Sequence, residues 1–296
     1  MNHAIGNPRS DHWVAASDAA QHTVEQMAAA SRSPLPVFIH GAAGTGKKHA
    51  ARVVHSLGTR ASGPLEVFSA RGISEERQHS ELFGGSQSAP GALTRAEGGT
   101  LVVDDLEALA APVLAELIDW LKKTTDRTAV AAGENPRLAI TSRSAEFPAD
   151  VEFVRIELAP LAERNECVLP LSAHFLGIFS REVGTDPVGI TSDARCWLLE
   201  ETWPGNVREL RERVRQAVHL AGSGAISAEA LVLAAEGDEV LSFKEAKRAF
   251  ETRYVEGLLR RCRGNISRAA RLARKDRKDF YDVIRRTGVD PAQFRA

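Results

Sequence analysis

The feature that most constrains the fold is a glycine-rich segment, Gly41-Ala42-Ala43-Gly44-Thr45-Gly46-Lys47, which matches the pattern Gly-x4-Gly-Lys. An apolar run at residues 36–40 predicts a buried strand before it, and residues 47–57 are predicted to form a helix after it. In that position the backbone N–H groups of the loop and the helix N-terminus attract phosphate, and the lysine reaches the phosphate oxygens. A glycine-rich turn without a ligand is the alternative. The candidate phosphate-binding residues are Gly41, Gly44, Thr45, Gly46 and Lys47.

A second group of candidates concerns a metal ion. Lys48 occupies the position at which such loops usually carry the Ser or Thr that ligates Mg²⁺. Residues 101–105, Leu-Val-Val-Asp-Asp, predict a buried strand ending in two carboxylates, where related enzymes hold Mg²⁺ and orient a water molecule. Asp104, Asp105 and Lys48 are therefore candidates for cofactor binding, although the two aspartates could instead cap a following helix. We expect ATP or ADP as the cofactor and leave Mg²⁺ open.

The order of the remaining segments predicts an α/β fold. Apolar runs at 65–69, 100–103, 137–141 and 154–158 alternate with helical periodicity, which is clearest over 106–123. This alternation indicates a mostly parallel sheet. After Pro160 the pattern becomes helical, over 168–183, 192–200, 206–221 and 227–233. We predict an N-terminal segment (1–33), an α/β nucleotide-binding subdomain (34–159), a helical subdomain (160–235) and a C-terminal domain (241–296).

The C-terminal domain is basic. Residues 241–296 hold 16 Lys/Arg and 7 Asp/Glu, a net charge of +9, whereas the rest of the chain carries −10. Two short helices, 265–273 and 277–286, are predicted around the turn Arg274-Lys275-Asp276, and Phe280, Val283 and Ile284 have the spacing of a buried face. A generic helical cap with a solvated surface is the alternative. The candidate DNA-binding residues are Arg268, Lys275, Arg277, Lys278, Tyr281 and Arg285.

An aromatic pattern lies upstream of these helices. Phe243, Phe250, Tyr254 and Leu258 keep helical spacing. The pattern fits a dimerisation helix and a core stripe within one domain equally well.

Several segments, taken in order along the chain, resemble those of one family. They are GAAGTGK at 41–47, ELFG at 81–84, PGALTRAEGGTLVVDD at 90–105, VRIELAPLAER at 154–164, WPGNVREL at 203–210 and GNISRAARLARKDRKDFY at 264–281. The chain therefore resembles the bacterial enhancer-binding activators that work with sigma-54 RNA polymerase. The resemblance implies a P-loop AAA+ parallel sheet with a helical lid over about residues 13–235, followed by a small all-α Fis-type helix-turn-helix. It also implies a nucleotide between sheet and lid, with Arg208 contacting phosphate.

The chain departs from that family where the family performs its chemistry. Only five residues, 85–89, stand where the family has a long loop with the GAFTGA motif, which grips sigma-54. Ser142 replaces an Asn that helps to orient water, and Asp105 replaces a Glu. Residues 144–153 contain no Lys or Arg, so the family's arginine fingers are missing. Arg274 stands where the family's turn favours Gly.

The sequence thus predicts a non-enzymatic regulator, without catalytic residues, that binds double-stranded DNA as a homodimer or higher homo-oligomer. We expect nucleotide binding without hydrolysis, no activation of sigma-54 polymerase, and RNA polymerase as a further partner. The alternatives are an active ATPase that remodels that polymerase and a sensor of another nucleotide, such as a cyclic dinucleotide, using Arg9, Arg52 and the P-loop.

The expected cellular location and the role of the cysteines follow from composition and residue spacing. No apolar run approaches the ~18–20 residues of a membrane span, and the N-terminus lacks the features of a signal peptide. We expect a cytoplasmic protein without membrane contact, and no separate input domain within residues 1–33. Cys167, Cys196 and Cys262 form no zinc or disulfide pattern, so we expect unpaired thiols and no metal site built from them.

Overall fold

The computed structural model describes residues 13–85, 90–124, 135–184, 189–222, 224–234 and 243–294, with only the backbone for 243–250 and 253. The chain forms two compact units. The first comprises the described residues up to Leu171 together with Trp203–Leu210, and the second comprises the remainder from Ser172. No helix of the described residues is long and apolar enough to cross a membrane.

The first unit is built on a five-stranded parallel sheet. Its strands are β1 (Val37–Gly41), β2 (Leu65–Ser69), β3 (Thr100–Asp104), β4 (Arg137–Ser142) and β5 (Val154–Leu158). Their order across the sheet is β2-β3-β4-β1-β5. The carboxyl ends of all five strands therefore meet at one edge, where ligands bind in open α/β sheets.

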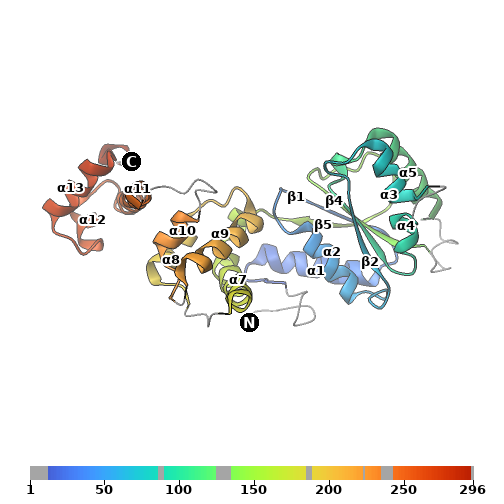
Figure 1. Ribbon diagram of the computed structural model, residues 1–296, viewed down its shortest axis with the longest axis horizontal. Helices are drawn as coiled ribbons and strands as arrows, with labels where there is room; N and C mark the ends of the chain where they lie inside the picture. The colour runs from blue at the N-terminus through green and yellow to red at the C-terminus, as the bar shows by residue number, and fades with distance from the viewer. Residues whose placement is uncertain are drawn as a thin grey trace. The chain divides into compact units, whose positions relative to one another are not determined.

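Helices cover both faces of this sheet (Figure 1). On one face lie α1 (Asp18–Arg32) and α2 (Lys47–Leu57), and on the other α3 (Glu75–Phe83), α4 (Ala92–Arg95) and α5 (Ala111–Thr124). Alternate strand residues serve the two faces, because side chains alternate along a strand. Phe38, Leu101, Val103, Leu138 and Ile140 belong to the core beneath α3, α4 and α5.

The positions of all five strands agree with the sequence prediction, and the fold class is confirmed. The predicted single helix over 106–123 is wrong. A short 3-10 turn, η1 (Leu106–Ala108), precedes α5, and the break falls at Leu109–Ala110. Side chains replace the helical ladder there, since the Ala110 amide donates to Gln78 Oε1 (2.8 Å) and Gln78 Nε2 donates to the Ala108 carbonyl (3.2 Å).

The N-terminal segment contains a helix that the sequence analysis did not predict. Ser17 caps α1 by accepting a hydrogen bond from the Ala20 amide at 3.2 Å. Thr23, Val24 and Met27 are buried on one side of α1. A serine followed by apolar residues three and four apart is the signal that could have revealed the helix.

The second unit is helical. It contains most of α7 (Val168–Val183), α8 (Ser192–Glu200), the later part of α9 (Asn206–Ala221) and α10 (Ala228–Leu233). Toward the C-terminus follow α11 (Phe243–Arg261), α12 (Ile266–Leu272), α13 (Arg277–Thr287) and the 3-10 turn η4 (Pro291–Phe294), drawn in red in Figure 1. The helices α7, α8, α9 and α10 begin and end within one residue of their predicted bounds.

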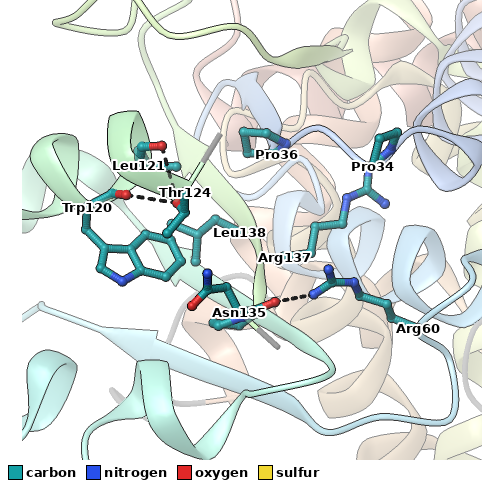
Figure 2. A pocket seen from close by; sticks show the side chains of 10 residues that line it. Pro34, Pro36, Arg60, Trp120, Leu121, Thr124, Asn135, Arg137 and Leu138 are labelled. Carbon is teal, nitrogen blue, oxygen red and sulfur yellow. Dashed lines mark hydrogen bonds between the residues drawn. The ribbon is translucent and has the colours of Figure 1, made fainter. Parts of the chain in front are cut away.

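A cavity of about 40 Å³ lies at the amino-end edge of the strands, beside the starts of β1 and β4 (Figure 2). Arg137 Nε donates to the Leu35 carbonyl (2.9 Å) and its Nη2 to the Ala30 carbonyl (2.7 Å), while Arg60 donates to the Asn135 carbonyl. Arg137 thus links the start of β4 to α1 and to the segment before β1, and Arg60 links the segment after α2 to the segment before β4. The candidate residues for phosphate lie at the opposite edge of the sheet.

Candidate nucleotide site and basic helices

The glycine-rich loop between β1 and α2 has the backbone conformation that its sequence requires. Gly44 and Gly46 have φ values of 77° and 107°, which L side chains rarely adopt. At Gly44 a Cβ atom would also lie 2.1 Å from the Gly205 carbonyl oxygen. Gly46 precedes the first turn of α2 and offers no side-chain cap to the amides of that turn. We call residues 41–47 the P-loop.

The side chains of the P-loop are turned onto the loop itself. Lys47 Nζ donates to the carbonyls of Gly41 (2.7 Å) and Ala42 (2.8 Å). Burial lowers the pKa of Lys47, and the nearby Glu107, Asp104 and Asp105 carboxylates oppose this shift. The buried Thr45 hydroxyl donates to the Ala42 carbonyl (2.9 Å). Lys47 is thus held within the loop, among carboxylates, by carbonyl contacts that a phosphate group could replace.

Two residues outside the predicted set fix the P-loop in place. Asn206 Nδ2 donates to the Ala43 carbonyl (2.9 Å), and its Oδ1 accepts from the Leu161 amide (2.7 Å). Asn206 adopts the left-handed region with φ 56°, which Asn tolerates better than most residues. The buried Arg164 donates from Nη2 to the Thr45 carbonyl (2.9 Å). The run Pro204-Gly205-Asn206 is a turn signal that could have pointed to Asn206.

Arg208 lies against the same loop. Its backbone amide donates to the Gly44 carbonyl (3.1 Å), and its charge acts on Lys47, whose pKa it helps to lower. The beginning of α9 therefore brings a third basic residue to the P-loop, beside Lys47 and Lys48. The structure thus brings Arg208 together with the predicted phosphate-binding residues.

The two carboxylates at the end of β3 already have basic partners. Lys48 Nζ lies 3.1 Å from Asp104 Oδ2, and the Thr141 hydroxyl donates to Asp104 Oδ1 (2.9 Å). Asp105 is ion-paired with Arg71 and lies 3.8 Å from Arg143 Nε. Asp105 has a left-handed φ of 63° and does not cap the following turn with its side chain.

Glu107 forms a further anionic centre that the sequence analysis did not identify. It accepts hydrogen bonds from the amides of Arg143 (2.6 Å) and Ser144 (3.1 Å). The Ser142 hydroxyl lies 2.8 Å from both Glu107 Oε1 and the Ser144 carbonyl, so it donates to one of them. Burial raises the pKa of Glu107, but these hydrogen bonds outweigh it and hold that pKa at about 2. The Ser142 hydroxyl hydrogen is therefore already used, by either Glu107 or Ser144.

The C-terminal helices present a separate set of basic residues. Phe280 and Ile284 are buried against Val255 and Leu259 of α11, and Val283 is half-buried, as the spacing predicted. Arg274 has φ 51° in the turn between α12 and α13. The side chains predicted to contact DNA are all exposed: Arg268, Lys275, Arg277, Lys278, Tyr281 and Arg285.

Several other predicted features can be located. Arg9 and the side chains of Phe243 and Phe250 lie outside the described residues, and Arg52 is exposed on α2. Tyr254 is 41% exposed and Leu258 packs against the α11–α13 core, so the choice between dimer helix and core stripe stays open. Cys167 and Cys262 are buried and Cys196 is exposed. Among the described residues no cluster of His, Cys, Asp and Glu could hold a metal ion.

Comparison with known proteins identifies the relatives of this chain. Residues 13–142 match the family described as the sigma-54 interaction domain, and residues 162–246 match the AAA+ ATPase lid domain. The transcriptional regulatory protein GlrR of Escherichia coli is 30% identical over 92% of this chain and 67% of GlrR. The sigma54-dependent transcriptional activator SfnR of Pseudomonas putida is 32% identical over 68% of this chain and 61% of SfnR. This chain belongs to the family of sigma-54-type transcription regulators.

Solved structures agree with this assignment. NtrX from Brucella abortus in complex with ADP superposes with a TM-score of 0.67 at 26% identity, covering 93% of this chain and 70% of NtrX. The ATP complex of the same protein gives the same TM-score at 25% identity. The parallel sheet with a P-loop and following helices is thus the AAA+ fold of the family.

Proposed function

We propose that this protein is a DNA-binding transcription regulator whose AAA+ unit binds ATP or ADP without hydrolysing it and does not activate sigma-54 polymerase. One observation carries the proposal: both carboxylates that would serve hydrolysis, Asp104 and Asp105, are already paired with basic side chains of the same chain. The P-loop remains suited to binding phosphate. The two carboxylates that would take part in hydrolysis are ion-paired with Lys48 and Arg71.

Nucleotide binding is supported by the P-loop and its surroundings. The loop has the glycine conformations that let amides face a phosphate, and Lys47, Lys48 and Arg208 bring positive charge to it. NtrX, whose fold this chain shares, has been solved with ADP and with ATP. When bound, the nucleotide would supply a phosphate group that Lys47 and the α2 amides hold.

The lack of hydrolysis is supported by three independent features. Asp105 Oδ2 is paired with Arg71, which competes with a water molecule for that oxygen. Ser142 is hydrogen-bonded to Glu107 or Ser144. Residues 144–153 contain no basic side chain, and Phe147 and Phe153 pack on Phe38 of β1 with ring centroids 5.7 Å away. Arginine fingers can be worth about 10³–10⁵ in rate, so their absence alone is a large loss.

The inability to activate sigma-54 polymerase is supported by the connection between α3 and α4. A Cβ atom on Gly91 would lie 2.4 Å from the Gly84 amide nitrogen, so the two ends of this connection touch. Six residues join them. A chain of that length with its ends together reaches at most about 12 Å outward, too short for a loop that must project from an assembled ring.

DNA binding is supported by the C-terminal helices. The first turn of α13 exposes Arg277 and Lys278, and Tyr281 and Arg285 follow on its accessible surface. Short helices joined by a tight turn commonly place the second helix in the major groove. The net charge of +9 over residues 241–296 favours the phosphate backbone.

Two assays test the proposal. Single-round transcription from a sigma-54 promoter, with ATP and no other activator, is expected to yield no transcripts, although the protein binds its own DNA site. Phosphate release is expected to be equally low for the wild type and Asp105→Asn, because Asp105 does not activate water. Appreciable transcripts, or phosphate release that Asp105→Asn abolishes, would show that the unit is an active ATPase.

A further inference from the structure

Lys48, which directly follows the P-loop lysine, carries a positive charge at a position where P-loops usually have Ser or Thr. We infer that the ammonium group of Lys48 takes the place of the divalent cation at the nucleotide site, so that ADP or ATP binds to this protein without Mg²⁺. The inference rests on the proposed nucleotide binding and specifies the chemistry of the ligand that the site accepts.

Each oxygen of Asp104 already has a partner within this chain, so a metal ion would have to compete with Lys48 and Thr141 for it. Lys48 Nζ lies 3.1 Å from Asp104 Oδ2, and the Thr141 hydroxyl occupies Oδ1 at 2.9 Å. The Asp104 side chain is only 17% exposed, whereas Lys48 is 48% exposed. An incoming ligand therefore meets the ammonium group before it meets the carboxylate.

The chemistry of the donor set argues against Mg²⁺. Mg²⁺ requires oxygen ligands in near-octahedral geometry and is usually held by one or two carboxylates and the phosphates. Lys48 supplies no oxygen ligand, and its ammonium group has no lone pair with which to bind a metal ion. Its positive charge beside Asp104 also repels a divalent cation. The neighbouring carboxylate, Asp105, is paired with Arg71.

The same group can perform the electrostatic task of the cation. An ammonium group donates charge-assisted hydrogen bonds to phosphate oxygens. Lys48 adjoins Lys47 at the start of α2, and Arg208 lies against the P-loop, so three basic residues surround the expected phosphate position. These residues supply the positive charge that Mg²⁺ provides in other P-loop sites.

The test is calorimetric titration of the full chain with ADP, in excess EDTA and in millimolar MgCl₂. For the wild type, the dissociation constants in the two buffers are expected to agree within about threefold. Lys48→Ser introduces a hydroxyl and removes the ammonium partner of Asp104, so its affinity in EDTA is expected to fall by about tenfold and to recover in MgCl₂. Lys123→Ser, at an exposed lysine of α5, is the matched control and is expected to behave as the wild type.

The possible results separate this inference from the proposed function. Binding by the wild type that weakens more than about tenfold in EDTA would overturn the inference and leave nucleotide binding intact. Lys48→Ser with unchanged affinity in both buffers would also overturn it. No heat of binding for the wild type in either buffer would overturn the proposed nucleotide binding and the inference together.

Discussion

Asn206 offers the sharpest test of how the P-loop is held. Its side chain joins the Ala43 carbonyl of the P-loop to the Leu161 amide that follows β5, and its left-handed backbone starts α9. Asn206 is 4% exposed and Leu161 is fully buried. Removing the side chain therefore leaves a buried N–H donor without its partner, which is more costly than losing an exposed hydrogen bond.

The magnitude follows from these contacts. The lost hydrogen bond to Ala43 contributes about 1 kcal/mol, and the unpaired Leu161 amide costs about 1–3 kcal/mol. Asn206→Gly, which accepts the left-handed backbone, is thus expected to lose about 2–4 kcal/mol of unfolding free energy. Asn206→Ala is expected to lose about 1–2 kcal/mol more, because a left-handed alanine is strained.

Urea unfolding followed by tryptophan fluorescence measures this difference. Three of the four tryptophans, Trp13, Trp120 and Trp203, belong to the first unit and report on it. Both variants are also expected to bind ADP more weakly than the wild type, since the P-loop loses its anchor. A loss below about 0.5 kcal/mol for Asn206→Gly, or equal stability of the two variants, would refute the reasoning.

Three further predictions concern the other parts of the protein. Lys47→Ala is expected to remove most of the affinity for ADP in a calorimetric titration, because a charge-assisted contact to phosphate is lost, and equal binding by wild type and variant would contradict the phosphate assignment. The double variant Arg277→Ala/Lys278→Ala is expected to weaken binding to the protein's DNA site by about 1–3 kcal/mol per lost base contact, as measured by fluorescence anisotropy. Its circular dichroism spectrum should be unchanged. Unchanged affinity would mean that another surface contacts the DNA bases. Glu107→Gln is expected to lower stability by about 1–2 kcal/mol at neutral pH, allowing for its 27% exposure. Because the pKa of Glu107 is held at about 2, the stabilisation by its carboxylate is complete above the ordinary pKa of 4.5 and is lost as the pH falls through 2. The unfolding free energies of the wild type and Glu107→Gln, measured in urea across this range, should therefore converge toward low pH. A difference that stays constant with pH would contradict the prediction.

Local patterns in the sequence predicted most of the framework. The five strands and the helices α2, α7, α8 and α9 depend on apolar periodicity and on turn residues near in sequence, and such signals act before any tertiary contact forms. The P-loop belongs to the same class, because its glycine spacing directly reflects a backbone that admits no side chain at Gly44. The buried face of α13 follows equally from the spacing of Phe280 and Ile284.

The partners of the charged side chains were decided by the tertiary structure. The sequence offered Asp104 and Asp105 as ligands for a metal ion, but their partners Lys48, Arg71 and Arg143 come from α2, from the segment after β2 and from the segment after β4. Only the packing of parallel strands brings these separate carboxyl-end segments to one edge. The break after η1 has the same origin, because Gln78 of α3 satisfies the backbone groups that a continuous helix would have paired internally. Asn206 likewise acquires its role only where α9 meets the P-loop, since its two hydrogen-bond partners lie 163 and 45 residues away in the sequence.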